Sequence, residues 1–121
     1  MYISSNKKIS DIQSQFNFIF PGLRVEFYKK PHKSYKGSLK DNLLDADIRL
    51  DTILPNLECD DVELTTETTV AKFEQELLDR FNLNVQVFRR SDKTWLQTIS
   101  TDDWTLAKQN EKGINSTINK Y

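Results

Sequence analysis

Cysteine, histidine and glycine are scarce in this chain of 121 residues, which holds one Cys, one His and three Gly. The single Cys59 cannot form an intrachain disulfide or a thiolate cluster, and the single His32 cannot supply a multi-histidine zinc site. The glycines lie far apart, so the chain contains neither a P-loop nor a GxGxxG turn. We therefore expect no metal, no cofactor, no catalytic residues and no enzymatic activity. An unfamiliar site made only of carboxylates stays open, although no spacing supports it.

Long apolar runs are also missing. No stretch reaches the roughly 18 apolar residues that span a membrane, and the opening MYISSNKKISDIQ lacks the apolar region of a signal peptide. We expect a soluble, cytoplasmic protein. Its 17 Lys+Arg and 18 Asp+Glu nearly balance, but residues 24–40 hold six Lys/Arg against one Glu, and residues 41–67 hold nine acids against one Arg. The near-zero net charge therefore conceals a polarised molecule.

Two segments of the chain repeat each other. Each carries an apolar stripe with the spacing of an amphipathic helix. The stripes are Ile9, Ile12, Phe16 and Phe20, and, 61 residues later, Val70, Phe73, Leu77 and Phe81. After each stripe, at residues 23–30 and 83–90, apolar and polar residues alternate as in a strand. A short extended segment precedes each stripe. Residues 1–30 and 61–90 thus each read strand–helix–strand, whether by duplication or by convergence.

These patterns predict one α+β domain over residues 1–113. We expect the two strand–helix–strand units to form a mixed β-sheet with both amphipathic helices on one face. An irregular charged connector, residues 31–60, separates them, and its residues 46–54 fit a short helix or an alternating segment. Residues 83–99 predict a hairpin that turns at Ser91-Asp92, with Trp95 opposite Phe88. A short helix over about 103–112 should stop at Gly113, leaving residues 114–121 as a flexible tail.

The strand pattern places aromatic and basic side chains on the sheet face that points away from the two helices. They are Tyr28, Phe88 and Trp95, with Arg24, Lys30 and Arg90 around them. An open face of this kind suits the stacking of single-stranded nucleic-acid bases. If the C-terminal helix covers it, the same side chains form a second small core. We favour the covered arrangement, because so short a chain needs its large apolar side chains for folding.

Two further surfaces are candidates for binding. One is a basic loop that could neutralise phosphates or simply be solvated; it carries Lys29, Lys30, Lys33, Tyr35, Lys36 and Lys40. The other is a docking edge formed by Phe18 and Ile19. Phe18 and Ile19 widen the apolar face of the first helix beyond a single stripe. The second half carries Asp79 and Arg80 at the matching positions.

The sequence favours a non-enzymatic protein–protein interaction or oligomerisation module, whose partner is another protein or a second copy of the chain. The alternative is a nucleic-acid-binding accessory protein that uses the sheet-face aromatics and the basic loop.

Residues 62–113 resemble a family of small conserved bacterial proteins without an assigned function. The resemblance is carried by VQVFRRS at 85–91, TWLQT at 94–98 and TDDWTLAKQN at 101–110. It implies a bacterial, intracellular protein and brings no catalytic or cofactor-binding residue. The chain departs from the family at Asp92, where glycine is expected in the hairpin turn.

Overall fold

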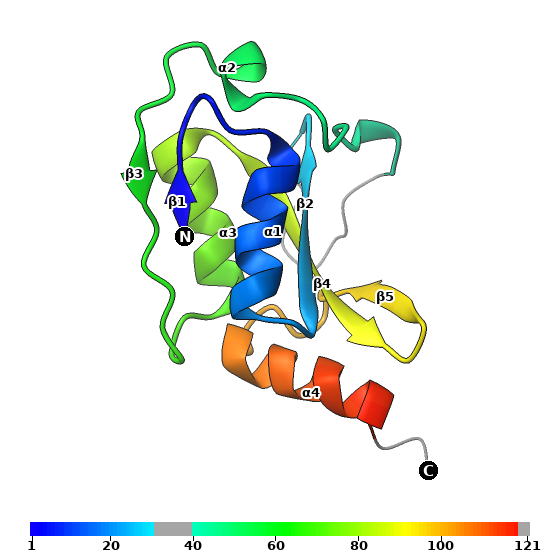
Figure 1. Cartoon of the computed structure of the whole chain (residues 1–121). Coiled ribbons are helices and arrows are strands. Elements are labelled where there is room, and N and C mark those ends of the chain that lie inside the picture. Colours follow the sequence, from blue (N-terminus) through cyan, green and yellow to red (C-terminus); the bar gives the residue numbers. More distant parts are fainter. Residues whose placement is uncertain (31–39, 119–121) are drawn as a thin grey trace.

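The computed structural model describes residues 1–30 and 40–118, which fold into an α+β domain (Figure 1). The elements are β1 (Tyr2–Ile3), α1 (Ile9–Ile19), β2 (Leu23–Tyr28), the 3-10 turn η1 (Lys40–Asn42), α2 (Leu50–Ile53), β3 (Asp60–Asp61), α3 (Val70–Phe81), β4 (Asn84–Ser91), β5 (Thr94–Gln97) and α4 (Leu106–Ile118). No helix in these two ranges has the length and apolar character needed to cross a bilayer.

The strands form two antiparallel sheets, β1–β3 and β2–β4–β5. The predicted α+β fold with a C-terminal helix is confirmed, but the single mixed sheet is not what forms. In each unit the strand before the helix pairs with its counterpart in the other unit, and so does the strand after it. The two strands of one unit therefore do not pair with each other, and every ladder among residues 1–30 and 40–118 is antiparallel.

The two halves are related by an approximate two-fold axis. Glu26 pairs with Gln86, 60 residues later, at the centre of the antiparallel β2–β4 ladder. Met1 and Val62, 61 residues apart, exchange backbone hydrogen bonds of 3.0 and 2.7 Å. An antiparallel pairing of residues that match in the repeat places a local two-fold axis between them. The residues that pair across this axis are therefore the same ones that match in the sequence repeat.

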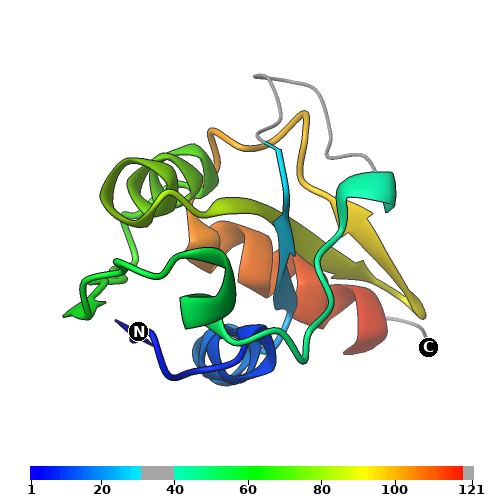
Figure 2. The ribbon, with the colours of Figure 1, turned by 90° about the horizontal axis from the view of Figure 1, so that it is seen from above.

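The core lies between the helices and the larger sheet. Figure 2 shows α1 and α3 on one side of β2, with β5 on the other. Alternate residues of the two strands, with Leu83 just before β4, face these helices and are buried: Leu23, Val25, Phe27, Leu83, Val85 and Val87. Between the helices, the rings of Phe16 and Phe73 stack with centroids 5.0 Å apart. The apolar stripes of both repeats thus meet in one hydrophobic core.

Backbone hydrogen bonds hold the start of α1 and the start of α3 in the same way. Ile9 and Ser10 donate to the carbonyls of Ile48 and Ala46, at 2.9 Å each. Val70 and Ala71 donate to those of Trp104 and Asp102, at 3.0 and 2.7 Å. Residues 45–50 and 101–106 are therefore equivalent, at an offset of 56, and satisfy amide groups that a helix start leaves unpaired. The structural similarity of the halves extends beyond the repeat that the apolar pattern predicts.

The last helix is longer than the sequence predicted. It runs to Ile118, and Gly113 lies inside it rather than after it. Residues 114–118, which we expected in a flexible tail, are therefore helical. Gly113 packs against the start of β2, where a Cβ atom on Gly113 would lie 2.4 Å from the carbonyl oxygen of Gly22. This glycine therefore permits close backbone approach and does not end the helix.

The β4–β5 turn also differs from the prediction. Ser91 pairs with Thr94 and Arg90 with Trp95, so the two turn residues are Asp92 and Lys93. Asp92 adopts a left-handed conformation, with φ of 57°, which aspartate tolerates in turns. The register is displaced by two residues from the prediction. An even displacement leaves Trp95 and Phe88 on the same face.

Candidate binding surfaces

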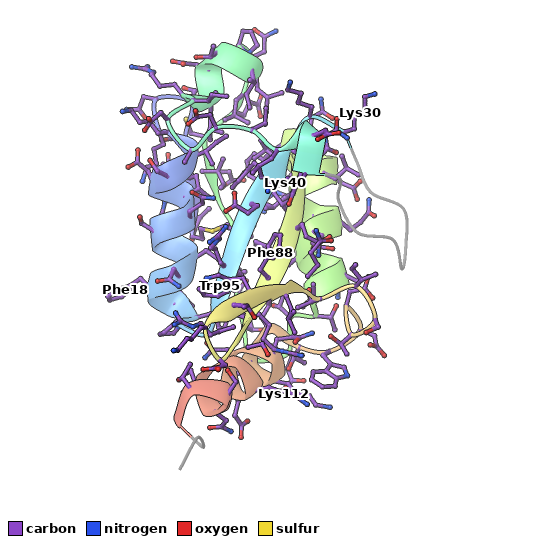
Figure 3. The ribbon with its side chains drawn as sticks, turned by 90° about the vertical axis from the view of Figure 1, so that its right-hand side faces the viewer. Phe18, Lys30, Lys40, Phe88, Trp95 and Lys112 are labelled. Atoms are coloured by element: carbon purple, nitrogen blue, oxygen red, sulfur yellow. The ribbon has the colours of Figure 1, made fainter. Side chains whose placement is uncertain are left out.

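The outer face of the larger sheet brings together four of the six predicted aromatic and basic residues. Arg24 and Phe88 are cross-strand partners, and the Arg24 guanidinium lies 5.8 Å from the Phe88 ring centroid and 5.6 Å from that of Trp95. Arg90 lies 5.5 Å from the Trp95 centroid. Figure 3 shows Phe88 and Trp95 on this face. The four side chains form a cation–aromatic cluster.

Tyr28 and Lys30 do not belong to this cluster. Tyr28 lies four residues along β2 from Arg24, about 13 Å away in a strand, and is only 5% exposed. Its backbone forms a bridge to Leu43. Burial, with a smaller contribution from the nearby carboxylate of Glu26, raises the pKa of Tyr28 to about 12. Tyr28 is therefore a neutral, buried group, and Lys30 is exposed beyond the end of the strand.

The C-terminal helix does not cover the outer face. The Arg89 side chain points to the opposite face from Phe88, and it is Arg89 that donates a 2.9 Å hydrogen bond to Gln109 of α4. Phe88 and Trp95 are half-buried, with guanidinium groups over their rings, and Arg24 also pairs with Glu26 at 2.6 Å. The expected second core beneath α4 does not form, and the basic side chains already contact both rings.

The basic loop falls largely outside the described residues, which is where Lys33, Tyr35 and Lys36 lie. Lys29, Lys30 and Lys40 are described and exposed. Lys30 and Lys40 lie at the same end of β2 (Figure 3).

The two residues of the predicted docking edge are exposed in the structure. Phe18 is 87% exposed, Ile19 42% and Tyr2 45%. Figure 3 shows Phe18 projecting from α1, away from the sheet. These side chains line an open groove of about 750 Å³, together with Met1, Lys7, Asp11, Ser14, Gln15 and Asp61. We call Tyr2, Phe18, Ile19 and this groove the α1 surface.

The equivalent region of α3 is built from ion pairs instead. Arg80, which corresponds to Ile19, binds Asp60 of β3 and Glu76. The hydrogen bond that Arg80 donates to Glu76 is the main cause that raises the pKa of Arg80, and Asp60 adds to it. The Asp61 amide and then Arg80 lower the pKa of Asp60 below its ordinary value. The two halves therefore share a scaffold but differ in the surface that they present here.

A further surface, which the sequence did not reveal, surrounds Trp104. The ring centroid lies 4.1 Å from Lys108 Nζ, 5.5 Å from Lys112 Nζ and 5.7 Å from the Arg89 guanidinium carbon. We call these four residues the Trp104 cluster. The i, i+4 spacing of the lysines was visible in the sequence, but the approach of Arg89 depends on how α4 packs on β4.

The described residues do not form a metal site. In residues 1–30 and 40–118, no three His, Cys, Asp or Glu side chains are placed to hold a metal ion. Cys59 is an exposed free thiol. No family model, no curated protein and no solved structure matches this chain. Function is therefore inferred from the surfaces described above.

Proposed function

We propose that this protein is a non-enzymatic interaction module that self-associates through its α1 surface. The observation that carries the proposal is Phe18, a large apolar side chain left 87% exposed beside a groove. An exposed aromatic side chain with apolar neighbours and an adjoining groove is typical of a protein interface.

A second copy of the chain fits this surface because knob and groove lie side by side on it. In a two-fold dimer, the same patch of each subunit faces the other, so each Phe18 ring can enter the partner's groove. The groove is open and shallow, so it can receive the face of an aromatic ring from a second copy.

The charges around the groove also favour self-association. The lining residues include Lys7 and the carboxylates of Asp11 and Asp61, of which Asp61 pairs with the Met1 amine at 3.1 Å. Because both signs occur on one patch, two-fold pairing brings Lys7 of one copy toward a carboxylate of the other.

The fold itself does not require these apolar side chains. At the corresponding positions of α3 the chain carries Asp79 and Arg80, and that half packs onto the same core. Phe18 and Ile19 are therefore best explained by a contact that the isolated subunit does not make.

Sedimentation velocity over a concentration series tests the proposal. The wild type should shift from monomer to dimer between about 10 µM and about 500 µM, the range of a small, weak interface. Phe18→Asp should remain a monomer, because a carboxylate cannot be buried in the partner's groove without a large cost. Leu96→Asp is the matched control: Leu96 is 45% exposed on β5, away from the α1 surface, and this variant should dimerise normally. A monomeric wild type throughout the series rejects the proposal.

The nucleic-acid alternative has weaker support. Tyr28 is buried, and Arg24 and Arg90 already contact the rings of Phe88 and Trp95. A stacking surface needs ring faces that are available to bases.

A further inference from the structure

We propose that the Trp104 cluster binds a phosphate group of a small phosphorylated ligand. This site lies on α4 and β4, so it is independent of the α1 surface and of the proposed dimer. Its residues are Arg89, Trp104, Lys108 and Lys112.

Three cationic side chains surround the Trp104 ring. All three charged groups lie within 5.7 Å of one point, the centroid of the Trp104 ring. The electron-rich ring face attracts cations and so offsets part of their mutual repulsion. A multiply charged anion bound among the three cations would offset the remaining repulsion. We therefore expect the cluster to bind an anion.

One of the three cations is fixed in place from beneath. Gln109 is fully buried in α4, and its side-chain oxygen accepts a 2.9 Å hydrogen bond from Arg89 Nη1. The amide nitrogen of Gln109 donates to the carbonyl and hydroxyl oxygens of Thr101, at 2.8 and 2.6 Å. This chain of bonds orients the Arg89 guanidinium before any ligand arrives, which lowers the cost of binding.

The three cations of the cluster, Arg89, Lys108 and Lys112, form no ion pair within the part of the protein that is described, residues 1–30 and 40–118. By contrast, Arg24, Arg49 and Arg80 each pair with an acid.

The two-fold relation of the halves shows that the scaffold can form without this cluster. The backbone carbonyl of Trp104 accepts a hydrogen bond from the start of α3, and the carbonyl of Ile48 accepts one from the start of α1. At the same offset of 56 residues, Trp104 and Lys108 correspond to Ile48 and Thr52. Because α2 ends at Ile53, Lys112 of α4 has no counterpart in α2. The indole and both lysines are therefore additions to the scaffold rather than conditions for it.

A phosphate matches these donors better than a carboxylate does. The guanidinium group presents paired N–H donors to two oxygens of one phosphate, and lysine ammonium groups act as point charges on its remaining oxygens. A phosphate monoester or pyrophosphate carries two or more negative charges, whereas a single carboxylate would leave much of the triple positive charge unbalanced.

Fluorescence titration with pyrophosphate and with adenosine monophosphate tests the site. The titrations use a Trp95→Phe protein, in which Trp104 is the one remaining tryptophan of two. Emission should change saturably with both ligands at low salt. Lys108→Gln/Lys112→Gln in the same background should weaken binding at least about tenfold, since it removes two charge-assisted contacts. Lys72→Gln, an exposed lysine of α3, is the matched control and should bind normally.

Several results would overturn the inference. One is the absence of a saturable change with either ligand at about 10 mM and low ionic strength. A second is an equal response to sodium chloride of matched ionic strength, which would indicate screening alone. A third is a single-stranded oligonucleotide or poly-glutamate that binds more than about a hundredfold tighter than both small phosphates. That outcome would assign the cluster to a polyanionic macromolecule.

Discussion

Phe16 and Phe18 stand two residues apart on α1 and should respond in opposite ways to truncation. Phe16 is fully buried, so Phe16→Ala removes a core side chain and leaves a cavity, which costs about 3–5 kcal/mol of unfolding free energy. Burying a whole Phe contributes about 1.5–3 kcal/mol, and Phe18 is 87% exposed, so its burial in the monomer contributes only about 0.2–0.4 kcal/mol. Alanine also favours the helix by about 0.5 kcal/mol. Phe18→Ala should therefore change monomer stability by less than about 0.5 kcal/mol in either direction.

Urea unfolding followed by far-ultraviolet circular dichroism measures both effects. At about 1 µM protein, where the proposed dimer is dissociated, Phe18→Ala should unfold at nearly the wild-type midpoint. At a concentration well above the dimerisation constant, the wild type should gain stability by mass action and Phe18→Ala should not. A loss above about 1.5 kcal/mol for Phe18→Ala at low concentration would instead show that Phe18 is part of the monomer fold.

Three further predictions concern the fold and the outer sheet face. Gly113→Ala should destabilise the protein by about 1–2 kcal/mol in the same urea assay, since the collision with the Gly22 carbonyl outweighs the gain of about 1 kcal/mol in helix propensity. A stabilised variant would contradict the packing of α4 on β2. Tyr28 titrates near pH 10 when unfolded and near 12 when folded, so its contribution to stability is complete below pH 10 and is lost as the pH rises toward 12. Wild type should therefore lose stability more steeply than Tyr28→Phe across that interval; parallel curves would show that Tyr28 is not shielded. Finally, oligo(dT) at about 50 mM salt should not quench the emission of Trp95 in a Trp104→Phe protein, and strong quenching would revive the nucleic-acid alternative.

The sequence was sufficient for the elements whose residues follow a clear period. The stripes beginning at Ile9 and Val70 predicted α1 and α3, because burial of one helix face requires that spacing. The alternation in residues 23–30 and 83–90 predicted which strand side chains face the helices. Alternation carries no information about strand direction, however, so the antiparallel pairing of β2 with β4 could not be read from it.

The candidate surfaces were predictable to different degrees. Comparison of the two halves identified Phe18 and Ile19, because the equivalent positions of the second half carry the charged residues Asp79 and Arg80. The Trp104 cluster was not predictable, because it depends on the position of α4 against the Arg89 side of the sheet. Tyr28 was misplaced for a similar reason: its burial depends on contacts made outside the strand, such as the bridge to Leu43.

The most direct test of the account is an isotope-filtered NOESY spectrum of an equal mixture of labelled and unlabelled protein at high concentration. In this experiment only contacts between two copies give cross-peaks. The two-fold dimer predicts cross-peaks from the Phe18 ring of one copy to Tyr2 and Ser14 of the other. Intermolecular cross-peaks centred on another surface, such as Leu96 of β5, would contradict it, and so would their complete absence.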